Sequence, residues 1–139
     1  AAADGQAECA AMQRRLAADG PIDLALLGVG VNGHLALNEP ARELQPECHV
    51  AALAETSKHH PMLSGHMKPP SHGLTLGMAA ILQSQHLLVL VSGAHKKDAM
   101  EKFLSRRITP QFPASFLWLH GNIDFLCDTA AMAGLEAPA

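Results

Sequence analysis

The sequence predicts a single α/β domain built on a parallel sheet. Residues 22–27 and 86–91 are nearly continuous apolar runs, which are typical of strands buried on both faces. Helix-like segments alternate with these runs, and such alternation indicates right-handed crossovers between parallel strands. The chain has 139 residues, enough for one domain, and we expect residues 1–139 to form a single, partial domain.

The individual elements follow from local composition. Strands are expected at 22–27, 86–91 and 122–128, and helices at 7–18, 77–84 and 93–105. In the last of these helices, Ala99, Met100 and Phe103 supply the apolar side. Proline and glycine predict loops over 40–49 and 59–73. Met78 and Trp118 are expected in the core.

Composition and charge exclude several classes of function. The net charge is −3 and no lysine- or arginine-rich run occurs, so no nucleic-acid partner is expected. The longest apolar runs have about six residues, whereas a membrane helix needs about 20, so no membrane association is expected. Cys9, Cys48 and Cys127 form no C-x-x-C pattern, which favours a reducing cytoplasm over a disulfide framework or a zinc site.

Residues 28–40, "GVGVNGHLALNEP", begin with the spelling G-x-G-x-x-G directly after an apolar run. A dinucleotide-binding loop also needs a helix of several turns and an acidic residue about 20 residues further on. Pro40 leaves little room for that helix, and Glu55 is the only acidic candidate. We therefore disfavour a nucleotide site. His34 and Glu39 still lie just past a strand end, where open α/β sheets bind ligands.

Four stretches together resemble a known family. "LLGVGVNGHLALNEP", "GLTLGMAAIL", "LVLVSGAHKKDAM" and "PASFLWLHGNIDFLCD" cover nearly all of residues 21–130 and resemble the hexosamine-6-phosphate deaminase/isomerase family, in its order. The related 6-phosphogluconolactonases share a G-x-G-x-D-G-H core but do not continue into N-E-P. The asparagine before G-H, "LQPECH" and "PASFLWLH" look most like the galactosamine-6-phosphate deaminases.

The resemblance implies a fold and a reaction. The fold would be the Rossmann-like parallel sheet of the sugar-phosphate isomerase/deaminase type, present here as a C-terminal portion. The reaction would convert a 2-amino-2-deoxyhexose 6-phosphate into a ketohexose 6-phosphate and ammonia, without a cofactor. For the galactosamine branch the product would be tagatose 6-phosphate. Family members commonly assemble, so a homo-oligomer is possible. The alternatives are a non-catalytic sugar-phosphate-binding fragment or pseudoenzyme, and a hydrolase similar to the 6-phosphogluconolactonases.

Three residues carry the chemistry that the resemblance implies. His34 matches the family's ring-opening histidine, and imidazole suits a proton shuttle because its pKa lies near neutrality. Glu39 matches the carboxylate that orients this histidine. Asn32 replaces the aspartate of many members, so we expect a lower pKa for His34 than with aspartate. Without the resemblance, His34 is ordinarily a turn residue and Glu39 a solvated loop residue.

Substrate binding is expected at four further positions. Gly30 and Gly33 let the backbone approach a ligand closely. Lys96 matches the family's substrate-binding lysine at a strand–turn–helix junction, where helix amides also favour an anion, although a helix-surface charge is the ordinary alternative. His60 aligns approximately with a phosphate-binding arginine.

Other parts of the family pattern have no match in the sequence. The phosphate loop and the aspartate that takes the C2 proton are expected upstream of residue 1. The allosteric positions near 42–51 differ in residue type, so regulation by an N-acetylated sugar phosphate is not expected. The histidines between 59 and 72 lack helical ligand spacing, so a metal site is not expected there, and the segment is interpreted as a lid over the sugar.

Overall fold

The computed structural model describes residues 4–53 and 70–136 of the chain. Its elements, in chain order, are α1 (Gly5–Asp19), β1 (Leu24–Gly28), β2 (His49–Ala52), β3 (His72–Thr75), α3 (Met78–Leu82), β4 (His86–Val91), the 3₁₀ turn η2 (Ala94–Lys96), α4 (Lys97–Leu104), the 3₁₀ helix η3 (Pro113–Leu119) and β5 (Ile123–Cys127). The three predicted strands and three predicted helices are therefore all present among the described residues.

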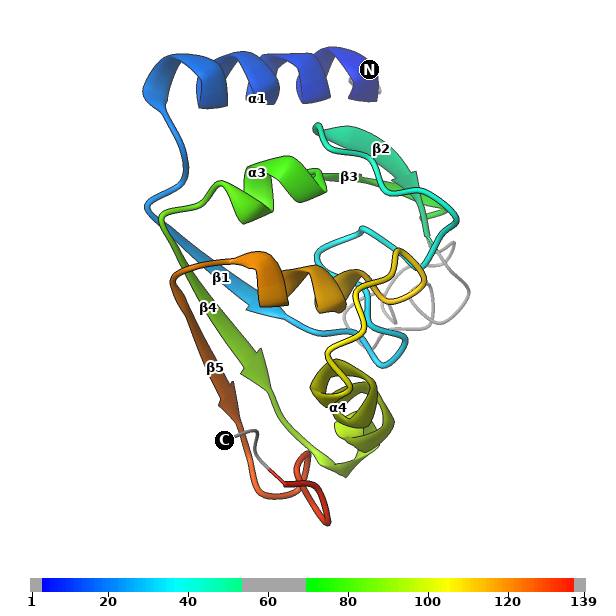
Figure 1. Ribbon diagram of the computed structural model, residues 1–139. Helices are drawn as coiled ribbons and strands as arrows, with labels where there is room; N and C mark the ends of the chain where they lie inside the picture. The colour runs from blue at the N-terminus through cyan, green and yellow to red at the C-terminus, as the bar shows by residue number, and fades with distance from the viewer. Residues whose placement is uncertain (1–3, 54–69, 137–139) are drawn as a thin grey trace.

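The central feature is a parallel three-stranded sheet in the order β1-β4-β5. β4 lies in the middle, with Leu88 opposite Leu26 of β1 and Asp124 of β5. This sheet confirms the predicted α/β class. Because all three strands run the same way, their carboxyl ends meet at one edge, and the loops that follow β1, β4 and β5 gather there (Figure 1).

The core lies between the sheet and the helices on one side of it (Figure 1). Leu87 and Val89 of β4 are fully buried. The Phe103 ring of α4 stacks between Trp118 and Phe125, with centroid distances of 5.0 and 4.5 Å. The predicted apolar side of α4 is thus confirmed. Met78 is also buried, and Trp118 packs against the core while its indole N–H donates to the Phe103 carbonyl oxygen.

Three elements were not expected from the sequence. β2 and β3 form an antiparallel two-stranded sheet that packs against α1, and η3 forms within the "PASFLWLH" stretch. The predicted loops over 40–49 and 59–73 are wrong at their ends, because His49 belongs to β2 and His72 and Gly73 belong to β3. Residues 59–69 lie outside the described part. Four-residue strands give too short a pattern for period-two alternation to show.

The expectation that the strands are buried on both faces is wrong for the described structure. On the face away from the helices, Leu24, Leu26, Leu90 and Leu126 are 54%, 62%, 46% and 55% exposed. The apolar runs indicate what a strand is able to bury, and in the described structure nothing covers these four side chains fully. We call these four leucines the bare sheet face. Among the described helices, none is long and apolar enough to cross a membrane.

We predict that the isolated 139-residue chain self-associates through the bare sheet face, because monomers seldom expose contiguous apolar patches of this kind. Burying one leucine is worth about 1.5–3 kcal/mol. The double substitution Leu26→Lys and Leu126→Lys should therefore raise the dissociation constant of the assembly at least about tenfold. Sedimentation velocity over a concentration series measures this. Met12→Lys, at a position of α1 that is 42% exposed and lies outside the bare sheet face, is the matched control and should change little. A monomeric unmodified chain with one cooperative melting transition would refute the prediction.

Candidate active site

The loop after β1 places the predicted site at the carboxyl edge of the sheet. Residues 29–38 form turns and isolated bridges instead of a helix, which agrees with the prediction against a dinucleotide loop. Leu35 is fully buried and bridges Val29 on one side and Asn38 on the other, so it anchors the loop in the core. Ala36, between them, adopts a left-handed φ of 51° that L-residues seldom adopt.

Contacts explain why Gly30 and Gly33 are glycines. A Cβ at Gly30 would lie 2.2 Å from Nδ1 of His34, so the imidazole ring occupies the space a side chain would fill. At Gly33 the φ is +88°, and a Cβ would lie 2.2 Å from the ring of Phe112. The Gly33 carbonyl also accepts from the backbone N–H of Ala114 at 2.8 Å. Both glycines thus shape the loop, and their predicted part in substrate binding stays a prediction.

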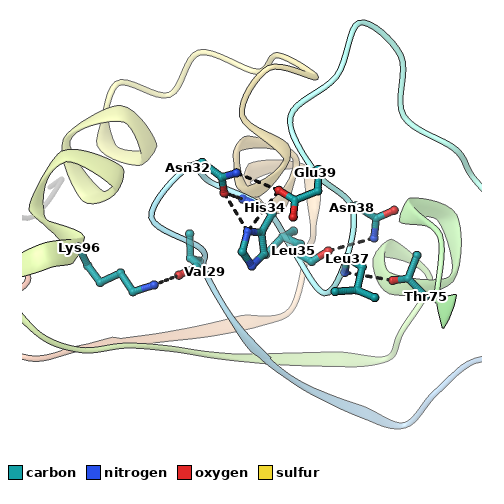
Figure 2. A network of polar contacts seen from close by, with 9 residues as sticks. All are labelled: Val29, Asn32, His34, Leu35, Leu37, Asn38, Glu39, Thr75 and Lys96. Carbon is teal, nitrogen blue, oxygen red and sulfur yellow. Dashed lines mark hydrogen bonds and ion pairs between the residues drawn. The ribbon is translucent and has the colours of Figure 1, made fainter. Parts of the chain in front are cut away.

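The structure brings Asn32, His34 and Glu39 together in one part-buried cluster (Figure 2). The side-chain amide of Asn32 lies between the other two. Its Nδ2 donates to Oε2 of Glu39 at 2.8 Å, and its Oδ1 lies 2.8 Å from Nδ1 of His34. The backbone N–H of His34 also donates to Asn32 Oδ1, at 3.2 Å. The His34 and Glu39 side chains are only 26% and 13% exposed.

This arrangement fixes where the proton of neutral His34 lies. Because Asn32 Nδ2 faces a carboxylate that only accepts, its Oδ1 must face His34, and a carbonyl oxygen cannot donate. Nδ1 of His34 therefore carries the proton, and Nε2 is the nitrogen with the lone pair. Oε2 of Glu39 lies 3.5 Å from the same Nδ1, close enough for its charge to stabilise a protonated ring. The His34 ring is therefore held by the neutral amide of Asn32 and stabilised by the negative charge of Glu39.

Lys96 reaches this loop from the neighbouring strand. It belongs to η2, directly after β4, and its Nζ donates to the Val29 carbonyl oxygen at 2.6 Å (Figure 2). Partial burial lowers the pKa of the Lys96 ammonium. Lys97, by contrast, is exposed. The structure therefore separates the two lysines, with Lys96 directed to the loop that carries His34.

Asp128 is a residue that the sequence reasoning missed. It follows β5, and its carboxylate accepts from the backbone N–H of Gly93 at 2.9 and 3.1 Å and from that of Ala131 at 2.7 Å. The backbone N–H groups of Ala131 and Gly93 hold the pKa of this carboxyl below its usual value. Gly93 has a φ of +93° and begins the turn that carries Lys96. The sequence signal that could have identified Asp128 is its position at the carboxyl end of the last predicted strand.

His60 lies outside the described residues, as does most of the segment interpreted as a lid, so these predictions stay predictions. Among the residues that the structure does describe, no group of three histidine, cysteine or acidic side chains is placed to hold a metal ion. The described site is a cluster of acid–base groups, with one lysine beside it, at the carboxyl edge of a parallel sheet.

An α/β fold with a histidine, an amide, a carboxylate and a lysine at this edge is suited to proton transfer on a small anionic ligand. The chain belongs to the family of glucosamine-6-phosphate isomerases and 6-phosphogluconolactonases, which residues 1–125 match. The resemblance inferred from the sequence motifs is thereby confirmed at the level of the family.

Individual relatives are deaminases by name. The chain is 43% identical over 122 residues to AgaI of Escherichia coli, which carries the name of a deaminase; the match covers 88% of this chain and 48% of AgaI. It is 32% identical over 137 residues to the glucosamine-6-phosphate deaminase of Oceanobacillus iheyensis, with 97% and 55% covered. The chain therefore spans about half the length of the curated relatives it matches.

Solved structures agree with this family. A monomeric glucosamine-6-phosphate deaminase of the NagB superfamily superposes with a TM-score of 0.87 at 35% identity, covering 94% of this chain and 55% of that one. The 6-phosphogluconolactonase of Trypanosoma brucei superposes with a TM-score of 0.68 at 26% identity, covering 98% and 56%. Deaminases and lactonases thus share the fold of this chain. The predicted homo-oligomer stays a prediction, since the deaminase structure is described as monomeric.

Proposed function

We propose that these residues form the ring-opening part of a deaminase that converts a 2-amino-2-deoxyhexose 6-phosphate into a ketohexose 6-phosphate and ammonia. The observation that carries the proposal is the Asn32–His34–Glu39 cluster, in which an amide orients an imidazole beside a carboxylate. Deaminase relatives at 43% and 32% identity support the same reaction class.

The cluster suits the opening of a pyranose ring. Neutral His34 carries its proton on Nδ1, so Nε2 takes the proton from the O1 hydroxyl of the sugar. The imidazolium that forms then gives this proton to the ring oxygen as the C1–O5 bond breaks, which leaves an open-chain aldehyde and a neutral histidine. Glu39, 3.5 Å from Nδ1, stabilises the imidazolium during this transfer. No cofactor is needed for this step.

Lys96 is assigned to the anionic part of the substrate. An ammonium group has three N–H donors, and the bond to the Val29 carbonyl oxygen uses one of them. The other two are available for a phosphate oxygen or an oxygen of the open chain. Because the ammonium is partly withdrawn from water, such a bond is stronger here than on an open surface.

We infer that the sugar is galactosamine 6-phosphate and the ketose is tagatose 6-phosphate, on the basis of Asn32 and the "LQPECH" and "PASFLWLH" stretches. The phosphate loop and the base that takes the C2 proton have no match in these residues. The proposal assigns both to the part by which the relatives are longer, so activity is expected from the full polypeptide that the gene encodes. In this proposal the enzyme acts in the cytoplasm.

In that full polypeptide, we predict that His34→Gln lowers kcat for ammonia release from galactosamine 6-phosphate by about 10²–10⁴-fold. The reason is that general acid–base assistance to ring opening is worth that much. A coupled ammonia assay measures it, with glucosamine 6-phosphate as the comparison substrate.

Three results would overturn this account. Unchanged turnover in His34→Gln would remove the histidine from the chemistry. Hydrolysis of 6-phosphogluconolactone without ammonia release from either amino sugar would instead favour the lactonase alternative, which the shared fold makes the second candidate. Binding of the sugar phosphate without any turnover would indicate a pseudoenzyme.

Lys96→Met should lower kcat/KM by one to two decades in the same polypeptide, because a charged hydrogen bond in a partly closed site is worth about 1.5–3 kcal/mol. Lys97→Met is the matched control and should change kcat/KM little, since Lys97 is exposed. Steady-state kinetics of both variants decides between the two roles. Equal and small effects of the two substitutions on kcat/KM would indicate that Lys96 is only a surface charge.

A further inference from the structure

We propose that Asn38 is a positioning residue that holds Glu39, and through it Asn32 and His34, in the geometry needed for proton transfer. The inference rests on the proposed function for its kinetic test, but its structural test is independent. Asn38 precedes Glu39 directly, so the orientation of one backbone segment fixes both side chains. Asn38 is 3% exposed, and it contacts neither His34 nor Asn32 by a hydrogen bond in the described part.

The side-chain amide of Asn38 ties the catalytic loop to the end of β3. Its Nδ2 donates to the Leu35 carbonyl at 3.0 Å and to the Leu76 carbonyl at 2.9 Å. One bond closes the loop's own turn, and the other crosses to a segment 38 residues away in the sequence. Figure 2 shows Asn38 directed toward the Thr75 side of the loop, while Glu39 faces Asn32.

Thr75 completes this attachment. Its Oγ1 accepts from the backbone N–H of Leu37 at 3.2 Å and donates to the Leu76 carbonyl at 3.0 Å. Thr75 is 7% exposed, so these bonds are shielded from water. Leu37, Asn38 and Glu39 are consecutive, which means that the carboxylate directly follows two residues that are both bound to the end of β3.

The loop needs such an attachment because its turn is strained. Ala36 has a left-handed φ of 51°, a conformation that is unfavourable for an L-residue. The turn keeps this conformation only if the residues after it are held in place. The backbone N–H of Asn38 donates to the Leu35 carbonyl at 2.9 Å, and the side-chain amide donates to the same oxygen. Asn38, which follows the strained residue by two positions, is thus bound twice to the residue that precedes Ala36.

Buried asparagine is an unusual choice for a purely structural position. Within the described structure, Asn38 Oδ1 has no hydrogen-bond partner, and a buried polar atom in this state costs stability. An apolar residue would avoid that cost but would leave the Leu76 carbonyl without this donor. An asparagine at this position is therefore explained by the two hydrogen bonds that its Nδ2 donates. These bonds fix the direction of the backbone just before Glu39.

The test uses Asn38→Ser in the full polypeptide, with two readouts. The first is kinetic: kcat should fall about 10- to 100-fold with little change in KM, because small displacements of catalytic groups cost rates of this order. The loss should be absent in a Glu39→Gln background, since Asn38 acts through Glu39. The second is the nitrogen NMR spectrum of His34, in which the Nδ1–H signal should broaden or shift as its bond to Asn32 loosens.

Asn122→Ser is the matched control. It removes a bond of the same kind, from Nδ2 to the Gln85 carbonyl at 2.9 Å, at the opposite end of the sheet. Activity and the His34 spectrum should not change. If Asn38→Ser does not fold, Thr75→Val removes the hydroxyl that binds Leu37 and should produce the same losses, whereas Thr75→Ser keeps a hydroxyl and should retain normal activity and the normal His34 spectrum.

The outcomes separate the two proposals. An unchanged His34 spectrum in folded Asn38→Ser, or kinetic losses that add fully to those of Glu39→Gln, would overturn the positioning role. A changed spectrum in a protein that releases no ammonia would leave the positioning role standing and refute the proposed function.

Discussion

The rest of the site depends on a single side-chain amide, that of Asn32. An amide has one donating and one accepting end, and here the donating end is bound to Glu39 and the accepting end to His34. This polarity gives the imidazole one tautomer, with the proton on Nδ1, and holds the carboxylate near the same nitrogen. An aspartate at position 32 would add a second negative charge. Because residue 32 is an asparagine, the carboxylate near Nδ1 of His34 in the described cluster is that of Glu39.

The amide keeps this position because distant parts of the chain hold its loop. Gly33 is bound to Ala114 at the start of η3, Leu37 to Thr75 at the end of β3, and Val29 to Lys96 after β4. The last two bonds join residues 38 and 67 positions apart. The parallel sheet makes this possible, since it brings the carboxyl ends of β1 and β4 to one edge. The site is therefore a property of the fold, although its three central residues lie within eight positions of one another.

The sequence predicted the sheet and the central residues for different physical reasons. The apolar run of β4 was long enough to mark a strand, whereas the roles of His34 and Glu39 were implied by the resemblance of their motif to a known family. The bond from Lys96 to Val29 and the attachment of Asn38 to Leu76 depend on contacts between distant segments, which no local pattern encodes. The apolar strands predict a sheet that needs cover on both faces, but an apolar strand does not reveal which residues cover it.

The most direct test of the account is the tautomer of His34 in the full polypeptide. Selective nitrogen labelling of histidine and long-range nitrogen–proton couplings report which ring nitrogen carries the proton when the ring is neutral. The account predicts the proton on Nδ1 in the unmodified protein. It also predicts a higher pKa for His34 in Asn32→Asp, because a carboxylate stabilises the imidazolium where an amide does not. A proton on Nε2 of the neutral ring would contradict the account, since Asn32 Oδ1 would then have no ring proton to accept.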